Sequence, residues 1–397
     1  MNLRQLFLEN IAQTSEFPLA LEFPSAKGSF LFDREGKKYL DLISGISVSN
    51  VGHRHPRVVQ AIKDQVDRYM HQIVYGEFVQ APQVLLATAL IRTMIPNHRG
   101  RAIDNVYFTN SGAEAVEGAM KLAKRYTGKS EIIACRNSYH GSTQGALSLG
   151  EESLRRNFRP LLPDIGKIER NDPASIEKIT GKTAAVIIEP VGAESGVRIT
   201  ETAFMTALAE KCRETGTLLI FDEIQTGLGR TGYTWAMEKF GFAPDIVLSA
   251  KALGGGLPLG AFMASREIMS VLRENPVLGH ITTYGGNPVS CASGLASLEV
   301  FREEIDLNEV KRKGERIRQI FEKHPDVKEV RGEGLMLAAE FADFRMLKGY
   351  IDRYIALGVI TDWFLYCDNS MRITPPLNIS DEEINELEEI ILSVKKR

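Results

Sequence analysis

Residues 245–261 read DIVLSAKALGGGLPLGA, an apolar run followed by a lysine and then three consecutive glycines. A short β-branched, apolar run bounded by turn residues is typical of a buried strand. Lys251 comes directly after this run, at the expected carboxyl end of the strand. An isolated lysine is usually a solvated surface charge, but one behind a buried strand is expected to be desolvated, which lowers its pKa and makes its amine nucleophilic.

Similar apolar runs recur on both sides of this segment. They occupy residues 105–110, 131–136, 184–189, 217–223 and 260–265. Helix-period stretches at 113–127 and 201–215 lie between several of them. This alternation predicts βαβ units around a mostly parallel sheet, and therefore a large three-layer α/β/α domain. Ligands of such sheets collect at the carboxyl ends of the strands.

The pattern changes from about residue 290, where long helix-period stretches and a short apolar segment predict a smaller α+β domain. The first 55 residues contain a hairpin signal at Arg34-Glu35-Gly36 and are expected to pack with that smaller domain. We therefore predict an N-terminal segment at 1–55, a large ligand-binding domain at 56–289 and a small domain at 290–397.

Composition excludes several classes of protein. The 397 residues are too many for one simple core, and their formal net charge of -3 gives no reason to expect a nucleic acid or a membrane surface as partner. Four cysteines without a C-x-x-C pair argue against a disulfide framework and against a metal site. The chain shows neither the pattern of a signal peptide nor an apolar run of roughly 18 residues, so we expect a cytoplasmic protein with small-molecule ligands.

Residues 227–232, GLGRTG, match the glycine fingerprint of dinucleotide-binding proteins. In that fingerprint the first glycine ends a strand and the third lies in a helix. Here Asp-Glu-Ile-Gln-Thr stands between the last apolar residue of the strand-like run, Phe221, and Gly227, and Tyr-Thr-Trp follows Gly232. We therefore expect a flexible loop and no dinucleotide site.

Residues 110–128, NSGAEAVEGAMKLAKRYTG, predict a helix that starts with a capping box of Ser111 and Glu114 and stops at Gly128. An ordinary capped helix explains this pattern equally well. Alternatively, the small residues Ser111, Gly112 and Ala113 let a ligand approach, and their N–H groups together with the helix dipole would bind a phosphate.

The run LLIFDEIQTG places Asp222 at the carboxyl end of a buried strand. A carboxylate there is poorly solvated unless it caps the next loop or meets a cation. The second option points to a cofactor with a protonated pyridine nitrogen, and Gln225 could then donate to the phenolate oxygen of the same ring.

Taken together, these features resemble a known family over nearly the whole chain. The motifs that carry the resemblance are, in chain order, GKKYLDLISGISVSNVGHRHP, FTNSGAEAVEGAMKLAK, NSYHG, EPVGAESGV, FDEIQTGLGRTG, SAKALGGGLPLGA, TTYGGNP and RITPPLNISDEEI. They are similar to those of the class III, or ornithine-type, aminotransferases, which belong to the fold-type I pyridoxal enzymes.

The resemblance implies a pyridoxal 5′-phosphate cofactor attached to Lys251 as a Schiff base. Lys251 would also shuttle a proton, Asp222 would keep the pyridine nitrogen protonated, and Tyr139 would stack on the ring. Taken alone, Tyr139 could equally be a half-buried core aromatic. The resemblance places these further residues around the cofactor: Ser111, Gly112, Ala113, His140, Glu189, Gln225 and Thr283.

Thr283 would reach the phosphate of the neighbouring subunit, so the resemblance implies a homodimer with shared active sites. Arg372 would bind the substrate α-carboxylate, although from the sequence alone it could form a surface ion pair. Glu194 would pair with Arg372 and release it only for such a carboxylate. The implied reaction moves an amino group, expected to be the terminal one of an acetylornithine-like, ornithine-like or other ω-amino donor, to an oxo acid such as 2-oxoglutarate.

Three departures from the family pattern concern the donor. Ser142 stands where acetylornithine and ornithine enzymes carry an arginine for the remote carboxylate, and Ile46 stands where ornithine enzymes carry a tyrosine. Gly192-Ala193-Glu194 replaces the commoner Q-G-E. Arg136 or Arg159 could supply a substitute cation.

Two other functions remain open at this point. The same fold and lysine serve aminomutases and amino-acid racemases, which need no oxo-acid acceptor. The presence of both Glu194 and Arg372 favours a two-substrate transaminase. A cofactor-binding regulatory protein without catalysis is the non-enzyme alternative, and the intact set of Lys251, Asp222 and Gln225 argues against it.

Overall fold

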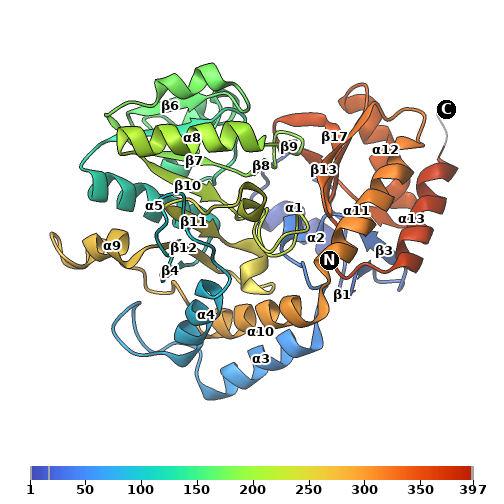
Figure 1. Cartoon of the computed structure of the whole chain (residues 1–397). Coiled ribbons are helices and arrows are strands. Elements are labelled where there is room, and N and C mark those ends of the chain that lie inside the picture. Colours follow the sequence, from blue (N-terminus) through green and yellow to red (C-terminus); the bar gives the residue numbers. More distant parts are fainter. Residues whose placement is uncertain (1, 17, 395–397) are drawn as a thin grey trace.

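The computed structural model describes residues 2–16 and 18–394 and is organised around a seven-stranded sheet (Figure 1). In sheet order the strands are β4 (Asn105–Thr109), β12 (Gly260–Ala264), β11 (Ile246–Ser249), β10 (Leu218–Asp222), β7 (Thr183–Ile188), β5 (Glu131–Cys135) and β6 (Ile165–Ile168). Strand β12 pairs antiparallel with both β11 and β4, and the other pairs of neighbouring strands in this sheet are parallel. The predicted mostly parallel sheet is confirmed.

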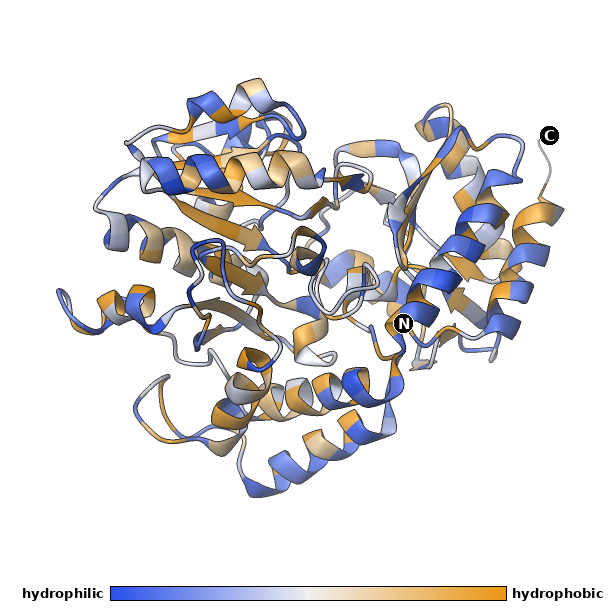
Figure 2. Cartoon of the chain, in the orientation of Figure 1, coloured by the Kyte–Doolittle hydropathy of each residue, from blue (hydrophilic) through white to orange (hydrophobic). Residues whose placement is uncertain are grey.

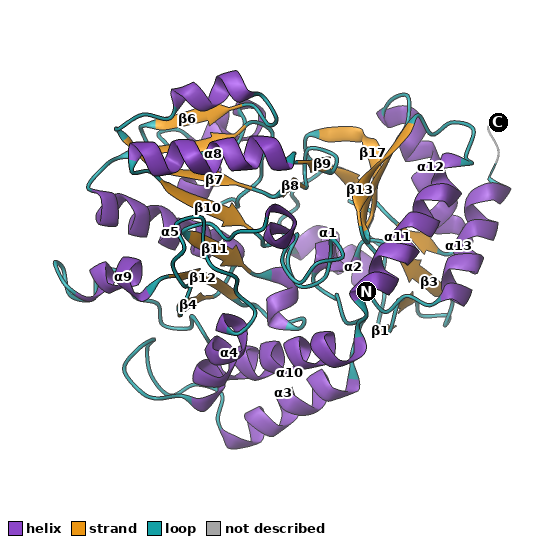
Figure 3. Cartoon of the chain, in the orientation of Figure 1, coloured by secondary structure: helices purple, strands orange, loops and turns teal. Residues whose placement is uncertain are grey.

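Alternate residues of each strand face two different helical layers. On β10, Leu218 and Ile220 pack with α5 (Gly112–Thr127), whereas Leu219 and Phe221 pack with α8 (Thr202–Thr215). The strands are apolar along their length, as Figure 2 shows, because both faces of the sheet are covered by helices (Figure 3). Polar chemistry is thereby restricted to the edges where the strands end.

A second sheet lies beside the first, toward the C-terminus (Figure 1). Its strands, in order, are β13 (Glu329–Glu333), β14 (Met336–Glu340), β17 (Cys367–Ile373) and β16 (Trp363–Phe364). The helices that pack in this part are α11 (Leu307–Glu322), α12 (Phe344–Leu357) and α13 (Asp381–Ser393). Ser380 caps α13 through a complete capping box with Glu383. The smaller α+β unit expected from the sequence is present.

The N-terminal segment forms a sheet with a strand from near the C-terminus. Strands β1 (Ser25–Lys27), β2 (Phe30–Phe32) and β3 (Lys38–Asp41) pair antiparallel, and β3 pairs parallel with β15 (Val359–Ile360). The predicted hairpin at residues 34–36 joins β2 to β3.

Helix α10 (Pro288–Glu304) packs against α3 (Pro56–Arg68) and α4 (Ala81–Ile91), which precede the large sheet in the chain. The division into residues 1–55, 56–289 and 290–397 stays a prediction. The packing of α10 favours a boundary after Glu304 rather than at 290.

The shorter elements connect these layers. They are α1 (Leu3–Asn10), α2 (Ser44–Ser47), α6 (Gln144–Ser148), α7 (Glu152–Arg155), α9 (Arg266–Met269), β8 (Val191–Gly192) and β9 (Arg198–Ile199), together with several 3₁₀ turns. Among the described residues, no helix has both the length and the apolar content needed to cross a bilayer.

The predicted capping box at the start of α5 is only half formed. The Ser111 hydroxyl accepts from Glu114 N at 3.2 Å, as expected. The Glu114 carboxylate, however, accepts from Asn110 N at 2.8 Å rather than from Ser111 N. The reciprocal bond has moved back by one residue, because the Asn110 side-chain amide also donates to the same carboxylate oxygen.

The GLGRTG segment is a loop, as predicted, but a buried one rather than an exposed, flexible one. Arg230 is wholly buried and donates to Leu335 O at 2.9 Å and also to Pro375 O and Asn50 Oδ1. Burial lowers the pKa of Arg230 to about 9. This guanidinium joins the loop to the N-terminal segment, through Asn50, and to the C-terminal part of the chain, through Leu335 and Pro375. These contacts explain why the loop is buried.

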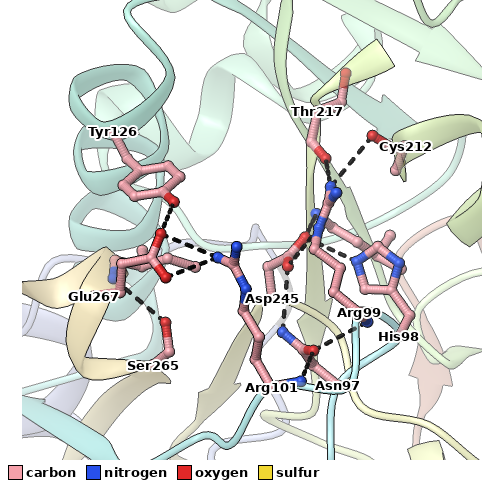
Figure 4. A network of polar contacts seen from close by, with 12 residues as sticks. Asn97, His98, Arg99, Arg101, Tyr126, Cys212, Thr217, Asp245, Ser265 and Glu267 are labelled. Atoms are coloured by element: carbon pink, nitrogen blue, oxygen red, sulfur yellow. Dashed lines mark hydrogen bonds and ion pairs between the residues drawn. The ribbon is translucent and has the colours of Figure 1, made fainter. Parts of the chain in front are cut away.

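A buried ionic network lies at the edge of the large sheet where its parallel strands begin (Figure 4). Asp245, directly before β11, accepts from Arg99 Nε at 3.1 Å and Leu219 N at 3.0 Å, and its Oδ2 lies 2.9 Å from His98 Nε2. Burial alone would raise the pKa of Asp245, but His98 and Arg99 bring it below its ordinary value. The 97–101 loop is thereby fixed to the residue that directly precedes β11, the strand that leads to Lys251.

We expect Asp245→Asn to lower the free energy of unfolding by about 3 kcal/mol, because it removes the buried carboxylate that pairs with Arg99 and His98. Urea titration of the variant measures this, with the exposed Glu210→Gln as the charge-matched control. The folded-state pKa of Asp245 is depressed, so the loss should be full above the ordinary aspartate pKa and shrink as the pH falls below it. An Asp245→Asn midpoint equal to that of Glu210→Gln would contradict the assigned role.

Candidate active site

A cavity of about 670 Å³ opens at the carboxyl ends of the large sheet's strands. Nine of the ten residues predicted to contact the cofactor line it: Ser111, Gly112, Ala113, Tyr139, His140, Glu189, Asp222, Gln225 and Lys251. They come from strand ends and loops that are far apart in the chain, and the sheet brings them together. Glu194 and Arg372 lie close by, in direct contact with each other.

Asp222 ends β10, and its carboxylate is fixed by two hydrogen bonds. His140 Nδ1 lies 2.7 Å from Asp222 Oδ2, and Ile224 N donates to Asp222 Oδ1 at 3.1 Å. Both His140 and Asp222 are buried. His140 Nε2 has no hydrogen-bond partner among the described residues. A carboxylate oriented in this way and lining a cavity is suited to a cationic ligand atom.

Lys251 lies next to Asp222 because β11 pairs parallel with β10, in a register that sets Leu248 opposite Asp222. Lys251 has a left-handed backbone with φ 49°, and its Nζ donates to Gln225 Oε1 at 3.1 Å. Burial lowers the pKa of Lys251; Glu194 opposes this shift and Arg372 adds to it. The neutral, nucleophilic amine is thereby favoured.

The first turn of α5 faces the same cavity. Its N–H groups at Gly112 and Ala113 precede any intrahelical acceptor, so they are available to an anion. A Cβ atom at Gly112 would lie 2.8 Å from Ile224 Cδ1, so a larger residue here would require the Ile224 side chain to move. The helix N-terminus and the Lys251 amine therefore bound one cavity from two sides.

Glu189 follows β7 and is almost wholly buried. Burial, together with the charge of Asp222, raises the pKa of Glu189 to about 8. Its Oε2 accepts from Ala193 N at 3.1 Å and lies 4.0 Å from Arg170 Nη2. The carboxyl group is therefore mostly protonated at neutral pH.

Arg372, on β17, is buried and paired with two carboxylates. Its Nη1 and Nη2 donate to Glu194 at 3.0 and 3.1 Å, and its Nε donates to Asp362 Oδ1 at 2.7 Å. Burial alone would raise the pKa of Glu194, but Arg372 brings it below its ordinary value. Burial raises the pKa of Asp362, although Arg372 opposes that shift. The surface ion pair considered from the sequence is thus excluded.

Thr283 does not line the cavity of its own chain. It is exposed on the loop that precedes α10. Two large side chains beside it in the sequence, Ile281 and Tyr284, are also exposed. The hydrogen bond from Tyr75 N to Thr282 O, at 3.1 Å, joins this loop to the segment around Tyr75.

Neither arginine considered as a substitute cation reaches the cavity. Arg136 Nε pairs with Glu169 at 2.7 Å, and Arg159 pairs with Glu152 at 2.7 Å, all on exposed side chains. Ser142 does line the cavity, where its Oγ lies 3.1 Å from the Tyr139 hydroxyl. Among the described lining residues, Lys251 is the only lysine or arginine.

Several functional candidates were missed in the sequence. Leu257, Pro258 and Leu259 form one wall of the cavity, and their place directly after the glycines that follow Lys251 could have revealed them. No local sequence pattern pointed to Asp362, because it comes close to its partner Arg372 only when β16 pairs with β17.

The sequence pattern of the family described as "Aminotransferase class-III" matches residues 11–394 of the chain. The acetylornithine aminotransferase of Methanocaldococcus jannaschii is 38% identical over 388 residues, 93% of this chain and 93% of that protein. The chain belongs to the class-III aminotransferases.

Solved structures agree with this class-III assignment. The ornithine aminotransferase of Toxoplasma gondii ME49 superposes with a TM-score of 0.90 at 29% identity, covering 98% of this chain and 93% of that one. Another structure of the T. gondii enzyme shows partial occupancy of PLP at its active site. The predicted fold-type I architecture and the prediction of an aminotransferase similar to the acetylornithine and ornithine enzymes are confirmed.

We expect Glu189→Gln to change how the stability of this class-III aminotransferase depends on pH. The folded pKa of about 8 exceeds the ordinary value of 4.5, so the folded protein holds a proton that the unfolded chain has lost, and wild-type stability falls as the pH rises through that interval. Glutamine cannot ionise, so the variant should be more stable than wild type above pH 8, by about 1 kcal/mol or more.

Urea midpoints of protein dialysed free of small ligands, taken across this pH range, measure the effect. The exposed Glu214→Gln is the control and should follow the wild-type curve. Parallel curves for wild type and Glu189→Gln would show that the Glu189 carboxyl titrates normally.

Proposed function

We propose that the protein is a pyridoxal-phosphate-dependent transaminase that takes a terminal amino group from an ω-amino donor and passes it to an oxo acid such as 2-oxoglutarate. The observation that carries this proposal is the convergence of Lys251, Asp222 and the N-terminus of α5 on one cavity. Pyridoxal phosphate carries a partner for each of them: an aldehyde for Lys251, a protonated ring nitrogen for Asp222 and a phosphate for the N-terminus of α5.

The residues present fit that cofactor. Gln225 Nε2 is buried without an acceptor among the described residues, although its Oε1 accepts from Lys251, so a donor is left for a phenolate oxygen. His140 orients Asp222, whose charge would hold the ring nitrogen protonated. Tyr139 lines the cavity and would stack on the ring. The cofactor, when bound, supplies the electron sink that makes loss of a substrate proton possible.

Lys251 would have two tasks in the reaction. Its amine would attach the cofactor covalently and, once displaced by the donor, would carry a proton from the substrate carbon. The lowered pKa of Lys251 suits both, because a neutral Nζ can attack and can accept a proton. Arg372 would bind an α-carboxylate after Glu194 withdraws from it.

The end of the donor remote from its reacting amine would lie against uncharged side chains of the cavity. Ser142 and Tyr139 bond to each other there, and no arginine lines the cavity among the described residues. We therefore propose a donor whose reacting amine is terminal and whose remote end needs no cation from this chain. Acetylornithine and ornithine, the substrates in the names of the relatives, remain the first compounds to test.

We also propose a homodimer in which Thr283 completes the partner's phosphate site. The exposed side chains of Ile281 and Tyr284, beside Thr283 in the sequence, are of the kind that a partner subunit covers. Because Thr283 does not line the cavity of its own chain, its proposed role requires a partner subunit, and the dimer and this role are tested together.

We expect Lys251→Ala to abolish amine exchange, because the attaching and proton-carrying amine is lost. Visible absorption of the wild type during titration with acetylornithine, ornithine, lysine, 4-aminobutyrate and glutamate identifies the donor, and 2-oxoglutarate should restore the starting spectrum. Borohydride reduction should add the cofactor's mass to the Lys251 peptide in wild type, and to no peptide in Lys251→Ala.

The exposed Lys63→Ala is the matched control and should behave as wild type. A wild-type spectrum that no donor changes would favour a mutase or racemase. A wild type that binds no pyridoxal phosphate at all would refute the proposal.

We expect Thr283→Ala to weaken retention of pyridoxal phosphate about tenfold, through loss of a hydrogen bond to a charged group. Equilibrium dialysis measures the affinity, and sedimentation should show an unchanged dimer. The exposed Thr202→Ala serves as control. Wild-type affinity in Thr283→Ala, or a monomeric wild type, would overturn the shared site.

A further inference from the structure

Arg372 is held on two edges by two different carboxylates. Its Nη atoms take both oxygens of Glu194, and its Nε takes Asp362 Oδ1 at 2.7 Å. The Phe364 ring lies 4.5 Å from the guanidinium carbon and covers one face. We refer to Glu194, Arg372 and Asp362 as the three-ion group.

The two carboxylates are placed by different means. Asp362 directly precedes β16, and Arg372 N donates to Asp362 O at 2.9 Å, so main-chain pairing keeps Asp362 beside Arg372. Glu194 belongs to the connection between β8 and β9 and reaches across from the other side. Its side chain is retained by Arg372 and by Leu365 N at 3.1 Å. Asp362 is therefore the fixed neighbour of Arg372, and Glu194 the exchangeable one.

One cation and two carboxylates leave the three-ion group with an excess negative charge. The Arg372 and Glu194 side chains are only 2% and 6% exposed, so solvent screens their charges weakly, whereas the Asp362 side chain is 26% exposed. When a substrate carboxylate replaces Glu194 on Arg372, a third carboxylate enters the same region. The charge of Asp362 opposes that entry, because like charges repel and the Arg372 side chain between them is almost excluded from solvent.

We propose that Asp362 is a specificity-determining residue that disfavours substrates with a carboxylate on the reacting carbon and so favours terminal amines. The inference rests on the proposed transaminase function. A terminal amine has no carboxylate on its reacting carbon, so Glu194 stays on Arg372 and no third carboxylate enters. Glutamate and 2-oxoglutarate must displace Glu194 against the charge of Asp362.

The Asp362→Asn variant tests this charge and keeps an acceptor for Arg372 Nε. In a mildly alkaline buffer, which favours the ionised form of Asp362 against the effect of its burial, we expect kcat/KM for glutamate and for 2-oxoglutarate to rise about tenfold. The kcat/KM for the best terminal-amine donor should change less than about twofold. Because the two half-reactions are separate, each constant reports its own substrate.

Asp368→Asn is the matched control, because Asp368 is exposed on the same strand as Arg372 and outside the three-ion group. It should leave every constant at the wild-type value. Asp362→Ser, which also removes the charge, provides a second variant in case Asp362→Asn lowers the urea midpoint.

Each outcome decides the proposal. A selective gain for glutamate and 2-oxoglutarate supports it. Unchanged constants, or an equal loss for both kinds of substrate, would overturn it, because the second result is that of a residue needed only for folding. A wild type without any amine exchange would instead refute the proposed function itself.

Discussion

The pairing of β10 with β11 sets the rest of the site. Both strands are buried on both faces, so a charged residue can occur only where they end. The parallel register brings Asp222 and Lys251 to the same edge, and the glycine-rich turn after Lys251 leaves room for a ligand between them. The opposite edge has the complementary task, since the Asp245 network there fixes the start of β11.

Around this edge the enzyme separates two electrostatic environments. Near Lys251 and Glu189, burial favours neutral forms, an uncharged amine and a protonated carboxyl. Near Arg372, ion pairing favours charged forms, and the guanidinium and Glu194 remain ionised despite burial. The chemistry proposed for the first place needs groups that gain and lose protons, whereas the recognition proposed for the second needs permanent charge.

Much of this could be predicted from local sequence. Apolar runs and helix periods are local patterns, so the strands, the helices and the strand-end position of Lys251 followed directly. Contacts between distant segments leave no such pattern. Arg230 looked like part of a flexible loop because its acceptors at Asn50 and Pro375 are far away in the chain. Asp362 was missed for the same reason, and Thr283 can be judged only with a second subunit.

The pairing of β3 with β15 joins segments roughly 300 residues apart, near the two ends of the chain. At about 5–20 residues per second, the ribosome releases the β2–β3 hairpin tens of seconds before β15 exists. During that interval one edge of β3 lacks its partner, and a free strand edge is a template for pairing with other chains. The edge of β3 is therefore open to other chains until β15 has been synthesised, an exposure that the folded enzyme no longer shows.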